Sequence, residues 1–244
     1  MQNAEIPVEG AGNSAVTVGR LADGDSATSW THDFRAPGGA TWSGVHTTPS
    51  VWGAACSARW LAEPEMLLLA APGGVTALTA DGQAWSTPIR PSDEPTLEGV
   101  DGKGLVIVRT DDGSDRPSTL RLDPATGTPR LVVEDVSTVS DPVVTLSGYQ
   151  WGLTLWGWWS IRLGDAEYRY AKGDESEGPV VGEGELDALL GEEFLGMEHP
   201  ENGDGPTTFL FTTARIEVLV DDPAWDPYVL RTPEGTWTGP SRPD

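Results

Sequence analysis

The sequence is poor in cysteine, lysine and histidine, and it has no long apolar run. One cysteine, Cys56, stands among 244 residues, which excludes an intrachain disulfide and a metal site built on several thiolates. The apolar residues before it favour a buried structural thiol over a nucleophile. No run approaches the roughly 18 apolar residues of a membrane-spanning helix. No charged-then-apolar leader opens the chain, so we expect a cytoplasmic or virion-associated protein, although a processed secreted form would look the same.

Positive charge is also scarce. The formal net charge is −23, and lysine occurs only at positions 103 and 172. Such a field repels the phosphates of nucleic acids and the headgroups of anionic lipids, so we expect neither as a partner. A solvated acidic surface explains most of this charge. The negative charge does not exclude a protein partner with a basic or mixed surface.

Glycine, proline and tryptophan are plentiful. The chain holds 30 Gly, 20 Pro and 11 Trp, and 38% of its residues are apolar. The glycines follow no three-residue period, which excludes collagen, and the large side chains argue against global disorder. This composition is typical of a turn-rich globular protein, and we expect one all-β domain spanning residues 1–244.

Short apolar runs recur at a regular spacing. Such runs begin near residues 66, 105 and 144, two steps of 39 residues, and two or three further strand-like segments separated by turns follow each. A period of about 40 residues with three or four strands is the signature of a β-propeller blade. A later cycle from residue 209 is displaced by an insertion at 174–206. We therefore predict a propeller-like repeat of about five units, with a β-sandwich as the alternative.

Two hairpin-like segments carry nearly the same residues. Residues 79–91 and 232–243 share a turn of Asp or Glu with Gly, followed by Trp, Pro and Arg, and residues 37–44 hold a fainter copy. Residues 79–85 resemble a degenerate Asp-box of sialidase-type propellers. Both longer copies are similar to the Trp-bearing strand ends of small fucose-binding lectin propellers.

The lectin resemblance implies a carbohydrate-binding function. In that family the Trp stacks on a sugar, and Arg and Glu bond its hydroxyls. An aromatic face suits the C–H side of a pyranose, and a guanidinium suits its hydroxyls. The alternative is that each Trp packs between neighbouring units. The sugar-binding candidates are Trp42, Trp85, Arg90, Trp237 and Arg242.

Residues 174–206 differ from the rest of the chain. They contain eleven Asp or Glu and neither Lys nor Arg. Leu186, Leu189 and Leu190 have helical spacing, so we predict one short helix near 185–190, ended by Gly191. A dense Trp cluster precedes this segment, and alternation places Trp158 and Trp159 on opposite faces of a strand. The predicted partner-binding residues are Trp151, Trp156, Trp158, Glu183, Glu185, Asp187, Glu192 and Glu193.

Residues for metal binding or catalysis are few. His32, Asp33 and His46 could approach one another, but their spacing matches no standard ligand pattern, so we predict neither a metal nor a cofactor. The chain lacks the nucleophile-elbow, phosphate-loop, dinucleotide and zinc-protease motifs. We therefore expect a non-catalytic interaction protein: a subunit of a larger assembly, such as a phage virion or injection-type particle, or an acidic inhibitor or immunity protein.

Overall fold

A computed structural model of the chain describes residues 3–90, 93–111, 118–140, 143–156, 158–170, 181–199, 205–219 and 227–239. These residues form strands almost throughout, with one short helix among them, which confirms the prediction of an all-β protein. They divide into two compact units, residues 1–129 and 130–244. Each unit is described by itself, and the single domain over 1–244 stays a prediction.

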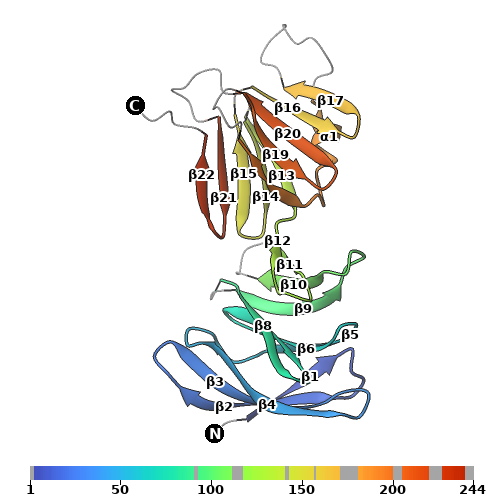
Figure 1. The fold of residues 1–244 in the computed structure, drawn as a ribbon, viewed down its shortest axis with the longest axis vertical. Helices are drawn as coiled ribbons and strands as arrows, with labels where there is room; N and C mark the ends of the chain where they lie inside the picture. Colours follow the sequence, from blue (N-terminus) through green and yellow to red (C-terminus); the bar gives the residue numbers. More distant parts are fainter. Residues whose placement is uncertain are drawn as a thin grey trace. The chain divides into compact units, whose positions relative to one another are not determined.

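An eight-stranded sheet dominates the first unit (Figure 1). Its order is β4-β3-β2-β1-β5-β6-β7-β8, antiparallel except for the parallel pair β1–β5. The strands are β1 Asn3–Glu9, β2 Ala15–Asp23, β3 Ala27–Arg35, β4 Thr41–Pro49, β5 Ser57–Ala62, β6 Glu65–Ala71, β7 Gly74–Thr79 and β8 Gly82–Pro88. The sheet curls until its end strands meet, where the Thr47 amide of β4 donates to Gln83 Oε1 of β8 at 2.9 Å. It is therefore nearly closed, like a barrel.

Alternating side chains fill the inside of this barrel-like sheet. On β3 every second residue from Thr28 to Phe34 is buried, as a strand with one face toward a core requires. The Trp42 and Trp60 rings lie 5.0 Å apart, and Phe34 packs edge-on against Trp42. Valine, isoleucine and leucine from β1, β2, β6 and β7 complete the core.

A four-stranded sheet completes the first unit, in the order β12-β11-β10-β9. Its strands are β9 Glu94–Val100, β10 Val106–Asp111, β11 Ser118–Leu122 and β12 Pro129–Arg130. The Arg59 Nε of β5 donates to the Leu97 carbonyl of β9 at 3.2 Å. Cys56 is exposed rather than buried as predicted, because it precedes β5 instead of lying within a strand. Its thiol nevertheless lies near the Ala70 and Pro95 carbonyls. The partial burial of the sulfur raises the pKa of the thiol.

The second unit contains two five-stranded sheets (Figure 1). The first, in the order β13-β14-β15-β21-β22, comprises β13 Asp135–Ser140, β14 Val143–Gly148, β15 Trp151–Leu155, β21 Tyr228–Thr232 and β22 Gly235–Thr238. The second, in the order β17-β16-β20-β19-β18, comprises β16 Trp158–Leu163, β17 Ala166–Tyr170, β18 Phe194–Glu198, β19 Thr207–Phe211 and β20 Ala214–Leu219. All of the registers recorded within the two sheets are antiparallel.

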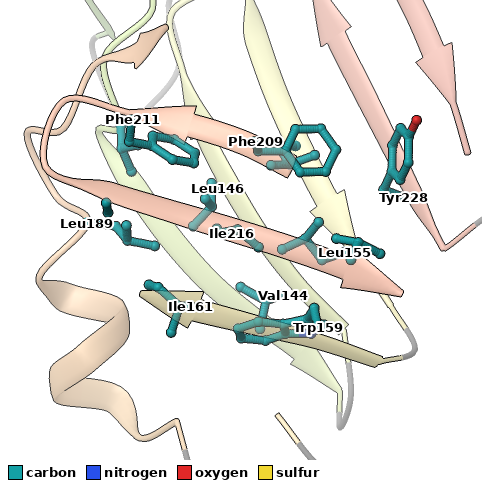
Figure 2. Close-up of a cluster of buried hydrophobic side chains, with 14 of the residues drawn as sticks. Val144, Leu146, Leu155, Trp159, Ile161, Leu189, Phe209, Phe211, Ile216 and Tyr228 are labelled. Atoms are coloured by element: carbon teal, nitrogen blue, oxygen red, sulfur yellow. The ribbon is translucent and has the colours of Figure 1, made fainter. Parts of the chain in front are cut away.

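One apolar core joins these two sheets. Figure 2 shows Leu146 and Leu155 of the first sheet facing Ile161 and Ile216 of the second. Phe209 packs edge-on against Tyr228 with ring centroids 4.9 Å apart. The unit is therefore two sheets packed face to face, and the residues of each strand that alternate with the core residues point away from the core.

The sheets do not reproduce the predicted repeat. The apolar runs near 66, 105 and 144 do become the strands β6, β10 and β14. The 39-residue rhythm nevertheless reflects spaced hairpins rather than separate blades. The strands β5 to β8 join β1 to β4 in one sheet, and β15 pairs with β21 from much later in the chain. A propeller of about five units is not confirmed.

The acidic segment 174–206 is partly built into the second unit. Residues 174–180 and 200–204 lie outside the described part of the chain. The helix α1, Glu183–Asp187, is shorter than predicted and begins two residues earlier. Leu186 and Leu189 are buried in the core as expected, whereas Leu190 is exposed. The helix ends at Asp187 with Ala188 as its C-cap, so Gly191 does not end it as predicted. Gly191 instead has a φ of +84° in the turn that follows, a conformation that glycine adopts at little cost.

Candidate functional site

The predicted Trp cluster divides between core and surface. Trp151 is buried, donates its indole N–H to the Val132 carbonyl at 3.0 Å, and stacks on Phe194. Trp156 is half-buried just after β15. Trp158 is 42% exposed, whereas its neighbour Trp159 is 3% exposed within the core. Alternation along β16 therefore works as predicted, and it presents Trp158 to solvent.

The predicted acidic residues are mostly bonded within the chain. Glu192 accepts hydrogen bonds from the backbone N–H of Thr213 at 2.6 Å and from its hydroxyl at 2.9 Å. Glu193 pairs with Arg130 at 3.1 Å. Glu185 accepts the Gly182 amide at the start of α1, at 2.9 Å, and so caps the helix. These three carboxylates hold local structure together rather than form an open acidic patch.

Two further predicted acidic residues lie in α1, Asp187 and Glu183. Asp187 is exposed at the end of α1. Glu183 begins the helix, and its side chain lies outside the described part of the structure. Of the predicted acidic residues whose side chains the structure describes, Asp187 is therefore the one left open to a partner.

The predicted sugar-binding tryptophans lie in different environments. Trp42 is buried in the barrel core, and Trp85 is buried, with its indole N–H donating to the Pro124 carbonyl at 2.9 Å. Neither ring offers an open face for stacking. Trp237, on the edge strand β22, is 37% exposed, and Arg90 is exposed. Arg242 lies outside the described residues.

The outward face of the second sheet carries Trp158 and, further along the strands, a set of charged side chains. On β16 the residues that alternate with the core are Trp158, Ser160 and Arg162. Arg162 pairs in register with Glu167 on β17 and with Arg215 on β20. Ser160 pairs with Arg169 and Glu217 on the same two strands. We define the Trp158 face as Trp158, Arg162, Glu167, Arg169, Arg215 and Glu217.

Ion pairs order this face. The Arg162–Glu167 distance is 3.0 Å, Arg169 Nε lies 3.5 Å from the same carboxylate, and Arg215 pairs with Glu217 at 3.1 Å. The hydrogen bond from Arg162, with the two arginine charges, lowers the pKa of Glu167. The Arg162–Glu167 pair joins two neighbouring strands, whereas each of the other two pairs lies within one strand. Opposite charges at neighbouring positions of a sheet face help to hold long side chains in place. The face is therefore a pre-arranged set of charges with an indole at one end.

The three arginines of this face were not predicted as site residues. The 158–163 alternation already places Arg162 on the same strand face as Trp158, and that signal was available in the sequence. Arg215 joins them only because β16 pairs with β20, which is more than 50 residues later in the chain. No local pattern reports such a pairing.

The histidines predicted to approach one another do so. His32 Nδ1 and His46 Nδ1 lie 3.2 Å apart inside the barrel-like sheet. Asp33, which alternates with His32, is exposed on the outside. Within the described ranges, no group of three His, Cys, Asp or Glu is placed to hold a metal ion. In the same part of the chain, no helix combines the length and apolarity that crossing a bilayer requires.

Comparison of the chain with protein-family models, with curated proteins and with solved structures gave no match.

Proposed function

We propose that this chain is a non-catalytic protein-binding component that docks through the Trp158 face. The observation that carries the proposal is the 42% exposure of Trp158 on the same sheet face as a set of arginines held by ion pairs. A subunit of a larger assembly, such as a phage virion or injection-type particle, or an acidic inhibitor, would use such a surface. Tryptophan and arginine are the residues most enriched where binding energy concentrates in protein interfaces.

The exposed part of the indole has enough area to anchor a partner. A tryptophan side chain offers roughly 150–250 Å², so 42% exposure leaves on the order of 60–100 Å² for a partner to cover. At about 25 cal/mol per Å², that contact contributes roughly 1.5–2.5 kcal/mol. The arginines of the same face are already held by carboxylates, so ordering them on binding costs little conformational entropy.

The charge on this face favours a partner with a mixed surface. Its three arginines are balanced by Glu167, Glu217 and the exposed Glu198 of β18, the other edge strand of the sheet. The chain as a whole carries −23. The surrounding field would therefore accelerate the approach of a basic partner, while the face itself pairs with alternating charges.

Affinity capture with matched variants tests this proposal. The intact chain and its Trp158→Ala and Trp237→Ala variants would be used as baits in an extract of the cells that express it. Wild type and Trp237→Ala are expected to retain a common protein that Trp158→Ala loses by about tenfold or more. Retention of the same proteins by Trp158→Ala would contradict the proposal.

A carbohydrate-binding function is the second candidate. It depends on Trp237, which remains partly exposed, because Trp42 and Trp85 are enclosed and Arg90 belongs to the other unit. A glycan array with wild type, Trp237→Ala and Trp158→Ala separates it from the first proposal. Binding that is lost in Trp237→Ala but kept in Trp158→Ala would favour the lectin function.

A further inference from the structure

We propose that the His32–His46 pair makes the closure of the barrel-like sheet acid-sensitive, so that protonation inside the barrel releases β4 from β8. This inference is independent of the protein-binding proposal. It depends on three observations: the position of the pair, the bond between the two rings, and the narrow seam that closes the sheet.

The pair lies in a polar layer inside an otherwise apolar barrel. His32 and His46 are each 4% exposed. Beside them the Trp30 indole N–H donates to Thr48 Oγ1 at 2.9 Å. The β3–β4 register places Trp30 opposite His46 and His32 opposite Gly44. The His32 ring lies directly over Gly44, where a Cβ atom would come within 3.2 Å of it.

The bond between the rings requires at least one neutral imidazole. With the two Nδ1 atoms 3.2 Å apart, one ring must donate and the other must accept. A first proton places a charge in an apolar interior, and a second leaves two donors facing each other. Burial lowers the pKa of both rings, and burial together with the proximity of His32 lowers that of His46 to about 4.

The surrounding strands supply no buried counter-charge. Apart from His46, β4, β7 and β8 contain no charged residue in their sequences. The charged residues on the other strands around the pair are exposed or half-exposed: Glu5 and Glu9 on β1, Arg20 and Asp23 on β2, Asp33 and Arg35 on β3, Arg59 on β5 and Glu65 on β6. Asp33 raises the pKa of His32, but this effect is smaller than that of burial.

The seam lies next to this pair. The strand β4 is held on one side by a nine-residue ladder to β3, whereas on the other side its Thr47 amide donates to the Gln83 side chain of β8. Thr47 directly follows His46. A charge on the His46 ring therefore destabilises β4, whose contact with β8 is weaker than its ladder to β3. Separation of β4 from β8 would expose the charge to water without unfolding the whole unit.

Hydrogen exchange of the full chain tests the proposal. After correction for intrinsic rates, protection of the Thr47 amide, which donates across the seam, is expected to fall about tenfold or more between pH 7 and pH 4.5. Protection of the β4 amides bonded to β3 and of residues 65–71 is expected to fall much less. His46→Gln should remove this pH dependence, and the matched control His199→Gln should retain it, since His199 is exposed in the other unit. Equal protection of the Thr47 amide at both pH values would overturn the proposal.

A second measurement needs no variant and covers the case in which His46→Gln does not fold. In an NMR titration of the wild-type imidazoles, the His32 and His46 rings should titrate below the usual value near 6.5. Ordinary titration of both rings near pH 6.5 would overturn the proposal. Zinc added at neutral pH should leave the protection of residues 41–49 unchanged. A clear increase would instead assign the two histidines as metal ligands.

Discussion

The barrel-like sheet of the first unit and the second sheet of the second unit place their polar side chains on opposite sides. The barrel encloses a His pair and a Trp–Thr hydrogen bond among its apolar residues. The sheet that carries β16 turns mainly apolar and aromatic side chains toward its core, with Thr207 also buried, and keeps its arginine–glutamate pairs outside. Enclosed polar groups couple the fold to protonation, because a charge there has no water to solvate it. Outward polar groups leave stability almost untouched and are available for recognition.

The largest expected effect tests the apolar side of this comparison. Phe209→Ala removes a fully buried ring that contacts Tyr228, and it should lower the free energy of unfolding by about 3–5 kcal/mol. The control is Leu210→Ala in the same strand, where the side chain is half-buried on the outer face, with an expected loss of less than about 1.5 kcal/mol. Urea denaturation measures both. Similar losses would contradict the assignment of the two faces of β19.

An intermediate effect tests the enclosed polar pair. Unfolded His46 binds a proton near pH 6.5, whereas folded His46 does so only near pH 4. The stability that depends on its neutral form is therefore present above pH 6.5 and lost as the pH falls toward 4, by about 2–3 kcal/mol. Urea midpoints of wild type and His46→Gln between pH 7 and pH 4 measure this loss. If the urea midpoints of wild type and His46→Gln depend on pH in the same way, His46 does not cause the loss of stability.

The smallest effect separates bonded from open carboxylates. Glu192→Ala removes the acceptor for both the amide and the hydroxyl of Thr213, and it should cost about 1–2 kcal/mol. Asp187→Ala, at an exposed position of α1, is the control and should stay within about 0.5 kcal/mol of wild type. Thermal unfolding distinguishes the two. If Asp187→Ala destabilises the chain as much as Glu192→Ala, the bonds of Glu192 do not account for the difference.

Local rules predicted much of this structure from the sequence. Alternation placed Trp158 and Trp159 on opposite faces of a strand, and Asp81-Gly82 lies in the predicted hairpin turn between β7 and β8. A short helix lies near the predicted position, although it ends before Gly191. Each of these features depends on residues a few positions apart, where turn chemistry and side-chain period act directly.

Long-range pairing could not be predicted in the same way. The 39-residue rhythm reports where hairpins fall, but not which strand edges join, so β15–β21 and β16–β20 were missed. The predicted acidic patch failed for a related reason. Glu192 and Glu193 bond to Thr213 and Arg130, and these partners reach them only after the strands assemble.

Photo-crosslinking at position 158 tests the central claim most directly. A photoreactive phenylalanine derivative would replace Trp158 in the intact chain, with the same derivative at Trp237 as the control, in cells that express the protein. We predict one discrete crosslinked protein from position 158 that is absent from position 237. No crosslinked protein from position 158, or the same products from both positions, would contradict the assignment of the Trp158 face as the docking surface.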